Sequence, residues 1–448
     1  MKTDMTIAMI GLGYIGLPTA CLLAKSGFNV LGIDINQSVV DQVNRGEIHF
    51  VEPGLNVVLK EVTSKRQLTA FTKPQAAEVY IIAVPTPFKG QSEPDMTFVE
   101  AAALSIAPLL KRGDLVILES TSPVGSTRHL SEIFARARPD LLFPHQLAQA
   151  EETPSIHLAY CPERILPGKA LEELVANDRI LGGMTPTCAE LAERVYKNFV
   201  RGNCWRTTAE TAEMAKLTEN AYRDVNIAFA NELSLICDKL KIDVWELIQL
   251  ANHHPRVNIL KPGPGVGGHC IAVDPWFIYH KTPDLAKMIS TARTINDGKP
   301  DFVLAKIQEA VDDLETKGEK VNKISFLGLS FKPNIDDFRE SPALAIVEKW
   351  AHLRPAHGIA VVEPHIQKLP SSLEGFSNLH LESLTEALYS EICVILVAHD
   401  DFVVANNELM VYKKSERKRI LDFQGILSMS SESVNEREVL YLGTKTGS

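Results

Sequence analysis

The sequence lacks the cysteine pattern of a disulfide-bonded or zinc-binding protein. Its seven cysteines are scattered, odd in number and without a CxxC pair, whereas disulfide frameworks and structural zinc sites need paired or closely spaced thiols. We therefore expect free thiols and a cytoplasmic protein. Cys270 and three nearby histidines, His253, His254 and His269, match no structural zinc spacing, so we expect no bound metal.

Positive charge and long hydrophobic runs are also scarce. The formal net charge is -10 at pH 7, which argues against a general binder of nucleic acids or anionic membranes, because such proteins use clustered positive charge to displace counterions from phosphates. The apolar stretch 6–24 has regularly spaced glycines and no clear cleavage site, so we interpret it as part of the fold rather than as a signal peptide. No other run is long and apolar enough to cross a bilayer. We expect neither nucleic-acid nor membrane partners.

What the sequence does contain is an alternation of short β-rich runs and helical patterns. Its 448 residues exceed the size at which a single core keeps growing, and βα alternation is typical of a parallel sheet with helices on both faces. The predicted strands of the first 200 residues are 6–13, 29–36, 79–87, 114–120, 157–163 and 179–184. Those after Lys320 are 323–332, 358–365, 391–402 and 419–425.

Between these two regions the pattern is helical. A long uninterrupted helix is predicted from about 207 to 240, with Thr207 or Thr208 as its N-cap. Helical segments follow at 243–252 and within 291–311. The apolar side chains of the long helix could also bury a partner subunit, which predicts a homodimer or higher homo-oligomer. They are Met214, Leu217, Ala221, Val225, Phe229, Leu233 and Ile236.

The clearest motif is the glycine-rich turn GLGYIG, which follows the first strand and opens a helix. An acidic residue ends the next strand, eighteen positions after the last glycine. A lone GxGxxG is weak, but this strand–turn–helix context with a later carboxylate is the fingerprint of a dinucleotide site, and the carboxylate favours NAD over NADP. The predicted cofactor residues are Gly11, Gly13, Tyr14, Ile15, Gly16 and Asp34.

Together these patterns predict an α/β protein with two Rossmann-like open parallel-sheet domains joined by a central helical domain with a long spine helix. We place the NAD-binding domain at 1–203, the helical dimerisation domain at 204–303 and the second Rossmann-like domain at 304–448.

Polar residues follow later strands of the first sheet. Pro85 and Thr86 lie in VPTP, and Thr121 and Ser122 in ESTSPVG, at the carboxyl edge where open α/β sheets bind ligands. Taken alone, each segment could equally be a turn. The CPERILPGKA segment brings Glu163 beside Arg164 at another strand end, where the ordinary interpretation of an adjacent pair is a surface ion pair.

Two further patterns point to chemistry. Lys216, Asn220 and Asp224 repeat at four-residue intervals on the long helix and so share a face; a solvated polar stripe is the alternative. Cys270 follows GPGVGGH, a backbone suited to close approach of a ligand rather than to packing around a structural thiol. A nearby lysine such as Lys216 would favour the nucleophilic thiolate.

In combination, these motifs resemble the nucleotide-sugar 6-dehydrogenases, the UDP-glucose/GDP-mannose dehydrogenase family. The resemblance runs from about residue 5 to 425 through GLGYIGLP, VPTP, ESTSPVGST, CPERILPG, KLTENAYRDVNIAFANEL, PGPGVGGHC and FKPNIDDFRESP. EPDMTFVE and HPRVNILKPGPGVGGHCIAVDPWF are most similar to the family's bacterial UDP-N-acetyl-D-mannosamine branch. The resemblance implies an N-terminal NAD domain, a central domain that holds a dimer and a C-terminal domain that binds UDP.

The resemblance also implies roles for individual residues. Cys270 would be the nucleophile, with Lys216, Asn220 and Asp274 around the reacting carbon and Glu163 as a general base. Lys332 would contact the substrate phosphates, Arg339 the cofactor, and Arg256 the sugar across a subunit interface. Thr121 is assigned to catalysis and cofactor, and Glu163, Arg164, Leu166, Lys216, Asn220, Asn258 and Gly267 to the substrate. A second glutamate of the UDP-glucose branch is missing between Arg164 and Gly168, which leaves Glu163 and Asp274 as alternatives for activating water.

The implied reaction is a four-electron oxidation of a primary alcohol at C6 to a carboxylate with two NAD, through a thiohemiacetal and a thioester on Cys270. UDP-N-acetyl-D-mannosamine is the first expectation for the substrate and UDP-N-acetyl-D-glucosamine the second, in surface polysaccharide biosynthesis. The alternatives are a two-electron hydroxyacid dehydrogenase and a non-catalytic protein that binds NAD or a nucleotide sugar.

Overall fold

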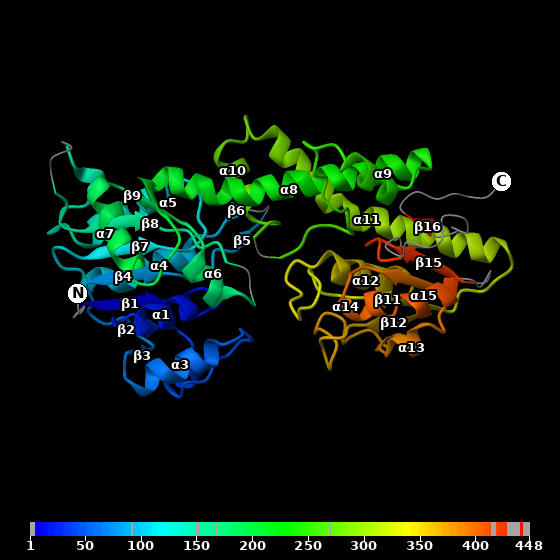
Figure 1. Ribbon diagram of the computed structural model, residues 1–448, viewed down its shortest axis with the longest axis horizontal. Coiled ribbons are helices and arrows are strands. Elements are labelled where there is room, and N and C mark those ends of the chain that lie inside the picture. Colours follow the sequence, from blue (N-terminus) through cyan, green and yellow to red (C-terminus); the bar gives the residue numbers. More distant parts are fainter. Residues whose placement is uncertain are drawn as a thin grey trace. The chain divides into compact units, whose positions relative to one another are not determined.

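The computed structural model describes residues 5–90, 93–148, 153–165, 168–268, 270–413, 418–427 and 440–441. The chain forms two compact units, each described by itself below (Figure 1). The N-terminal unit comprises Met1–Glu219 and Trp276–Pro283, and the C-terminal unit comprises Asn220–Pro275 and Asp284–Ser448. The division into three domains stays a prediction.

The N-terminal unit is built on an eight-stranded sheet with the strand order β10-β9-β8-β7-β4-β1-β2-β3. All its neighbouring strands are parallel except β8 and β9, which pair antiparallel. The strands are β1 (Thr6–Ile10), β2 (Asn29–Ile33), β3 (Leu68–Phe71), β4 (Val79–Ile82), β7 (Leu115–Leu118), β8 (His157–Tyr160), β9 (Arg179–Gly183) and β10 (Cys204–Thr208). The six predicted strands are confirmed with shorter bounds, and a small hairpin, β5 (Phe88–Lys89) and β6 (Glu93–Pro94), lies outside this sheet.

Two strands of this sheet were not predicted. β3 has only four residues, and β10 has the sequence CWRTT, in which no residue is fully buried. Central strands such as β4 are instead buried at every position and appear in the sequence as continuous apolar runs. An edge strand with exposed polar side chains gives no such signal.

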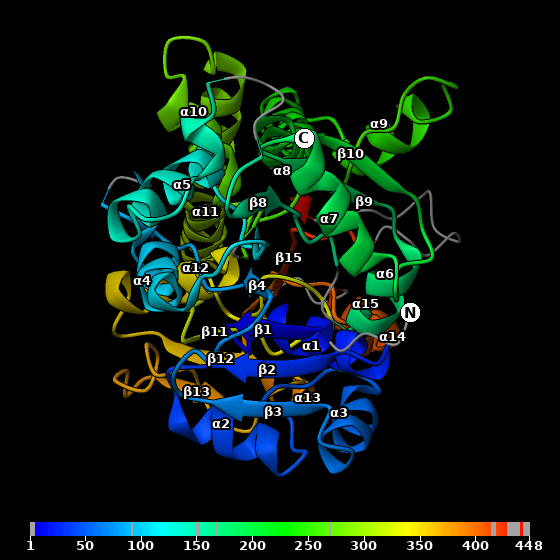
Figure 2. The same ribbon diagram turned by 90° about the vertical axis from the view of Figure 1, so that its left-hand side faces the viewer.

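Helices cover both faces of this sheet (Figure 2). One apolar core lies beneath α1, α3, α6 and α7, and a second lies beneath α4 and α5. The bounds are α1 (Gly16–Lys25), α2 (Gln37–Asn44), α3 (Leu55–Ser64), α4 (Thr97–Ile106), α5 (Ser126–Ala137), α6 (Ala170–Ala176) and α7 (Pro186–Tyr196), with short 3-10 helices at Ala107–Leu109 and Pro144–Gln146. This layering leaves the carboxyl ends of the parallel strands as the open edge of the sheet.

The long helix α8 (Ala209–Leu240) confirms the helical prediction. The Thr208 hydroxyl oxygen accepts a hydrogen bond from the Thr211 amide at 3.2 Å, so Thr208, not Thr207, caps the helix. Leu217 and Ala221 are buried, but Phe229 is 51% exposed. Part of the apolar face of α8 is therefore uncovered within the chain.

The C-terminal unit contains a six-stranded parallel sheet with the order β13-β12-β11-β14-β15-β16. Its strands are β11 (Lys323–Leu327), β12 (Gly358–Val362), β13 (Leu379–Leu381), β14 (Ile392–Ile395), β15 (Arg419–Asp422) and β16 (Leu440–Tyr441). The four predicted strands are confirmed with shorter bounds, while β13 and β16 were not predicted. Both are short, with three and two residues.

Helices again pack on both faces of this second sheet. α9, α11 and α12 share one core with the sheet, and α13, α14 and α15 contribute to a second. The bounds are α9 (Val244–Ala251), α11 (Lys287–Thr316), α12 (Pro342–Leu353), α13 (Leu384–Ala387), α14 (Asp400–Val404) and α15 (Asn406–Lys413). The helix α10 (Asp274–Lys281) belongs almost wholly to the N-terminal unit, which includes Trp276–Pro283. The helix expected within 291–311 is α11, which begins earlier and continues past Pro300.

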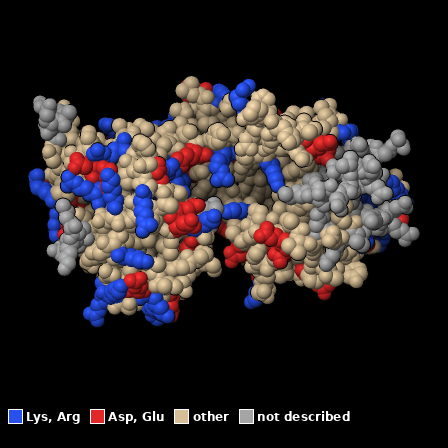
Figure 3. All heavy atoms as spheres, in the orientation of Figure 1, with Lys and Arg blue, Asp and Glu red and all other residues tan. Residues whose placement is uncertain are grey.

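The surface carries charges of both signs. Lysine and arginine side chains are interspersed with aspartate and glutamate over the face drawn in Figure 3. Among the described residues, no helix combines the length and apolar character needed to cross a membrane.

Candidate active site

The glycine-rich turn after β1 has the shape of a dinucleotide loop. Gly11 has φ +97°, and a Cβ at this position would lie 2.4 Å from the carbonyl oxygen of Ala83. A Cβ at Gly16 would lie 1.9 Å from the Gly11 oxygen, whereas the space around Gly13 is open. Gly11 and Gly16 are therefore required by the packing of the chain itself, and Gly13 leaves room for a pyrophosphate.

Asp34 lies beside this turn. Its Oδ2 accepts a hydrogen bond from the Leu12 amide at 3.1 Å, and its Oδ1 accepts one from the Asn36 amide at 2.9 Å. The carboxylate is half-buried and the following Ile35 is 90% exposed. A fixed carboxylate next to an open glycine turn fits the adenosine ribose of NAD and would repel the 2′-phosphate of NADP. The residues of this turn therefore fit NAD.

The neighbouring strand ends are joined to one another by hydrogen bonds. The Thr86 hydroxyl donates to the Thr121 carbonyl at 2.7 Å, and the Ser120 hydroxyl donates to the Val84 carbonyl at 2.8 Å. Ser122 is buried and donates to the Ser120 carbonyl at 2.9 Å, so its hydroxyl, proposed as a ligand group, serves the turn itself. Thr86 and Thr121 remain half-buried, and Pro85 and Tyr14 are exposed.

One residue that fixes this edge escaped the sequence analysis. The Glu213 carboxylate accepts hydrogen bonds from the Gly125 amide at 2.6 Å and from the Thr127 amide and hydroxyl at 2.8 and 2.7 Å. These are groups at the start of α5. Burial raises the pKa of Glu213, although these hydrogen bonds oppose the shift. A single glutamate within a long helix gives no sequence signal for a partner 86 residues away.

Glu163 does not pair with Arg164, contrary to the expected surface ion pair. Arg179 binds Glu163 Oε2 at 2.6 Å, and it also binds Glu119 Oε1 at 3.1 Å. The Arg164 backbone amide donates to Glu163 Oε1 at 2.7 Å, while the Arg164 guanidinium binds Glu219 at 2.9 Å and donates to the Asp178 carbonyl. The ionic partners of Glu163 and Arg164 are therefore residues that the fold brings close to them, and not each other.

The Arg179 cluster is a buried anchor beneath Glu163. Arg179 lies over the Tyr196 ring, 4.4 Å from its centroid, and the Tyr196 hydroxyl donates to Glu119 at 2.8 Å. Burial raises the pKa of Glu119 to about 7, with Arg179 opposing the shift. Removing one partner of a buried pair costs about 3–5 kcal/mol, so the cluster fixes the position of Glu163 strongly.

Lys216, Asn220 and Asp224 are all buried on α8, which rules out the solvated stripe. The Asn220 amide donates to Asp274 Oδ2 at 2.5 Å. Asp224 serves another purpose, because its Oδ1 is bound by Arg293 at 2.6 Å. Lys216 and Asn220, one turn apart, are thus the members of this face left for a site, and Asn220 brings Asp274 into it.

Cys270 begins the turn that leads into α10. Its carbonyl accepts hydrogen bonds from the amides of Val273 at 3.1 Å and Asp274 at 2.8 Å, which places the thiol one turn from the carboxylate that Asn220 holds. Cys270 is half-buried. By contrast, burial raises the pKa of Cys21 and Cys393 to about 12, so these two thiols are poor nucleophiles at neutral pH.

The glycines ahead of Cys270 make room for the protein itself. A Cβ at Gly267 would lie 2.5 Å from the Glu340 carbonyl oxygen and 2.7 Å from Phe331 Cβ, and one at Gly268 would lie 2.8 Å from the Phe331 ring. A Cβ at Gly265 would lie 2.9 Å from Pro342. The packing of the protein itself therefore accounts for glycine at these three positions, and Gly267 as a substrate contact stays a prediction. They hold the cysteine segment against the loop 331–342.

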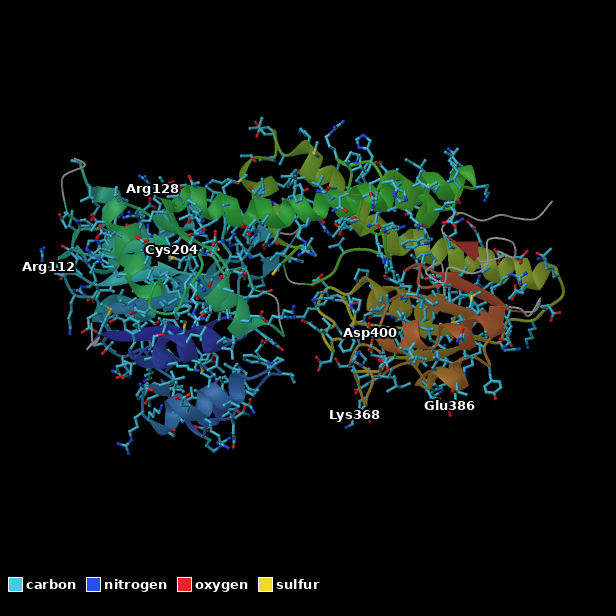
Figure 4. All side chains as sticks on the ribbon, in the orientation of Figure 1. Arg112, Arg128, Cys204, Lys368, Glu386 and Asp400 are labelled. Carbon is cyan, nitrogen blue, oxygen red and sulfur yellow. The ribbon has the colours of Figure 1, made fainter. Side chains whose placement is uncertain are left out.

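The remaining predicted residues lie on loops of the C-terminal unit. Lys332 is half-buried in the segment after β11, and Arg339 is exposed and binds Asp337 at 2.5 Å. Arg256 and Asn258 are exposed. Leu166 and His269 lie outside the described residues. Arg112, Arg128, Cys204 and Lys368, which were not predicted as site residues, are labelled with other side chains in Figure 4.

A group of potential metal ligands lies at the carboxyl end of the second sheet. Single ligand atoms of Glu363, His365 and His399 lie within 4.8 Å of one another. However, His399 Nδ1 accepts a hydrogen bond from the Asn334 amide at 3.0 Å, so a neutral ring carries its proton on Nε2, which faces Glu363 at 3.2 Å. Neither nitrogen then offers a lone pair to an ion.

These features define a class of protein: an oxidoreductase with a Rossmann-type NAD domain and a second parallel α/β sheet. Comparison with known families makes this specific. Three models of the UDP-glucose/GDP-mannose dehydrogenase family match, the NAD binding domain at residues 5–200, the central domain at 210–298 and the UDP binding domain at 325–429. The chain belongs to this family, and it is an NAD-dependent nucleotide-sugar dehydrogenase.

Individual relatives cover nearly the whole chain. It is 56% identical over 407 residues to UDP-N-acetyl-D-mannosamine dehydrogenase of Escherichia coli (strain K12), covering 90% of this chain and 96% of the relative. It is 55% identical over 397 residues to NDP-N-acetyl-D-galactosaminuronic acid dehydrogenase of Ralstonia nicotianae, covering 89% and 91%. Among solved structures, UDP-D-ManNAc dehydrogenase from Pyrococcus horikoshii matches with a TM-score of 0.83 and 36% identity, covering 98% of each chain.

Proposed function

We propose that the protein oxidises the C6 hydroxymethyl group of UDP-N-acetyl-D-mannosamine to the carboxylate, with Cys270 as the covalent nucleophile. The overall balance is one alcohol, two NAD⁺ and one water giving one carboxylate, two NADH and three protons. When bound, NAD accepts a hydride from C6 in each of the two oxidations. The observation that carries the proposal is the Cys270–Asp274 turn, whose carboxylate is held by Asn220.

In the first oxidation the substrate hydroxyl loses its proton as C6 loses a hydride, which gives the aldehyde. The negative charge that develops on the oxygen before the hydride leaves is stabilised by the Lys216 ammonium and the Asn220 amide, which α8 presents from one face. Both side chains are buried, and donors that are fixed before the reaction contribute more in such surroundings than in water.

The Cys270 thiolate then adds to the aldehyde carbon and forms a C–S bond. The resulting thiohemiacetal carries one more hydride, and its oxidation gives a thioester. Water attacks the thioester, the C–S bond breaks, and the sulfur leaves as the thiolate while the carboxylate is released. Sulfur suits this sequence because a thioester is hydrolysed more readily than an oxygen ester.

Two carboxylates are candidates for accepting the proton of that water. Arg179 and the Arg164 amide engage both oxygens of Glu163, whereas Asp274 lies in the same turn as the thiol. The variants Glu163→Gln and Asp274→Asn separate them, because the variant that accumulates a covalent thioester on Cys270, detected by intact-protein mass spectrometry, lacks the group that activates water.

NAD is assigned to the glycine turn and Asp34 of the N-terminal unit, and the UDP phosphates are assigned to Lys332 of the C-terminal unit. Arg339 as a cofactor contact stays a prediction. Arg256 and Asn258, exposed on one chain, would reach the sugar from a partner subunit in a homodimer. The exposed part of the α8 apolar face supports such a dimer. We place the reaction in the cytoplasm, in surface polysaccharide biosynthesis.

A specific similarity favours a second substrate. The Ralstonia relative, 55% identical, is named for an N-acetyl-D-galactosaminuronic acid, so UDP-N-acetyl-D-galactosamine is the next candidate. It ranks ahead of UDP-N-acetyl-D-glucosamine, the C2 epimer of UDP-N-acetyl-D-mannosamine.

A panel of UDP- and GDP-sugars, followed by NADH absorbance, tests the proposal. We expect the highest kcat/KM with UDP-N-acetyl-D-mannosamine and two NADH for each sugar consumed. One NADH per substrate would show a two-electron dehydrogenase, and preference for another sugar would replace the substrate assignment.

A further inference from the structure

A buried histidine lies beneath the loop that carries Lys332. His399 follows β14, is 0% exposed, and its ring Nδ1 accepts a hydrogen bond from the Asn334 amide at 3.0 Å. Asp400, labelled in Figure 4, begins α14 directly after this histidine, and its amide donates to the Asn334 side-chain oxygen at 3.0 Å. Asn334, two residues from Lys332, is therefore held at two points, by His399 and by the Asp400 amide.

The other nitrogen of the ring holds the opposite side of the loop. His399 Nε2 lies 3.2 Å from both oxygens of Glu363 and 3.3 Å from the Ser330 hydroxyl. Because Nδ1 accepts from an amide, Nε2 carries the proton and donates it toward Glu363. Ser330 in turn donates its hydroxyl proton to the Lys332 carbonyl at 2.8 Å. One imidazole thus organises the backbone on both sides of Lys332.

Glu363 binds the backbone at the start of the same loop. Its Oε2 accepts hydrogen bonds from the amides of Leu329 at 2.7 Å and Ser330 at 3.2 Å. Glu363, Leu329, Ser330 and His399 are nearly inaccessible to water. An unsatisfied donor or acceptor in such surroundings costs about 1–3 kcal/mol. The loop geometry therefore cannot relax without leaving buried polar groups unpaired.

We propose that His399 is a positioning residue for recognition of the nucleotide diphosphate. It fixes the Ser330–Asn334 loop so that the Lys332 ammonium meets the phosphates without a further loss of loop entropy on binding. The inference rests on the proposed function, in which Lys332 contacts the UDP phosphates. His399 itself touches neither substrate nor cofactor in this scheme.

Two variants separate the acceptor role of His399 Nδ1 from the donor role of Nε2. His399→Asn keeps an acceptor near the position of Nδ1 for the Asn334 amide, and His399→Gln keeps a donor near the position of Nε2 for Glu363 but loses that acceptor. UDP alone, titrated calorimetrically into the full-length protein, serves as the probe. We expect His399→Gln to weaken UDP binding about tenfold, the equivalent of one lost hydrogen bond, and His399→Asn to bind within about threefold of wild type.

Steady-state kinetics give the second readout. His399→Gln should raise the KM for the UDP-sugar while kcat and the KM for NAD change little. The matched control is His157→Gln, another buried histidine, at the start of β8 in the N-terminal unit; it should lower the melting temperature without weakening UDP binding.

The outcomes are distinguishable. If Lys332→Ala weakens UDP binding but His399→Gln does not, the inference is overturned while the role of Lys332 stands. If both His399 variants lose the same affinity in proportion to their loss of melting temperature, the histidine is merely structural and the inference is also overturned. If Lys332→Ala leaves UDP binding unchanged, the phosphate contact and the inference fail together.

Discussion

In each of the two sheets, the first strand along the chain, β1 or β11, is followed by the same kind of glycine turn. Gly11 follows β1 with φ +97°, and Gly328 follows β11 with φ +90°. The Gly11 amide donates to the Ile33 carbonyl at the end of β2, and the Gly328 amide donates to the Val362 carbonyl at the end of β12, each at 2.8 Å. In both, a left-handed glycine lets the chain leave one strand while it remains bonded to the next.

The carboxylate that ends the second strand is equivalent too. Asp34 accepts from the Leu12 amide at 3.1 Å, and Glu363 accepts from the Leu329 amide at 2.7 Å. The surroundings differ: Asp34 is half-buried, whereas Glu363 is buried beneath His399. One turn therefore leaves its carboxylate within reach of a ribose, and the other uses its carboxylate to hold its own loop.

The comparison shows that an acidic strand end does not by itself identify a ribose site. In the first unit the carboxylate is followed by an exposed Ile35 and lies beside an open Gly13. In the second, Ser330 replaces the open glycine and its hydroxyl donates within the loop. We infer that the second turn recognises phosphate through Lys332, not ribose through Glu363.

The largest expected effect removes the chemistry and leaves both nucleotide turns intact. Cys270→Ser should lower steady-state NADH production by about 10³-fold or more, since the serine hydroxyl is almost un-ionised at neutral pH and is a far weaker nucleophile than a thiolate. Calorimetry should show unchanged binding of NAD and of UDP. A variant that retains near-normal NADH production would exclude covalent catalysis by this thiol.

Lys332→Ala tests the ligand assigned to the second turn. A charge-assisted hydrogen bond to phosphate contributes about 1.5–3 kcal/mol, so the KM for the UDP-sugar should rise about 10- to 100-fold, with a smaller change in kcat. The KM for NAD is the internal control. A fall in kcat without a rise in KM would place Lys332 in the chemistry instead.

Asp34→Asn and Glu363→Gln separate the two carboxylates directly. Asp34→Asn should raise the KM for NAD about tenfold, because a carboxylate that accepts from ribose hydroxyls is replaced by a weaker acceptor. Glu363→Gln should leave the KM for NAD unchanged and lower the melting temperature. Equal effects of both variants on NAD binding would contradict the division of roles.

The sequence allowed the strands and the dinucleotide turn to be predicted because both are local. A central strand such as β4, VYII, is buried at every position and is recognisable from its continuous apolar run. β10 was missed because no residue of CWRTT is fully buried. The N-cap at Thr208 was predicted to within one residue, since it depends on only the next three positions.

The partners of the site residues could not be predicted, because they depend on long-range packing. Glu163 pairs with Arg179, sixteen residues away, and not with its neighbour Arg164. The lack of side chains at Gly267 and Gly268 was evident in the sequence, but the Phe331 ring that fills the space was not. The sequence shows that these two positions have no side chain, but only the fold shows which other residue occupies the space.

The smallest expected effect concerns acid stability and applies to the second turn alone. Burial acts to raise the pKa of Glu363, but hydrogen bonds from His399 and from the Leu329 and Ser330 amides outweigh it, so the pKa lies below its ordinary value. A carboxyl whose pKa is lower in the folded state stabilises the fold at pH values above the pKa of the unfolded state, about 4.3. This contribution is lost as the pH falls through the folded pKa.

Glu363→Gln should therefore reduce the acid dependence of the melting temperature below about pH 5. Melting curves of wild type and Glu363→Gln from pH 7 to 3 check this. An unchanged acid dependence in Glu363→Gln would mean that the bonds to His399 and the amides do not favour the ionised carboxylate.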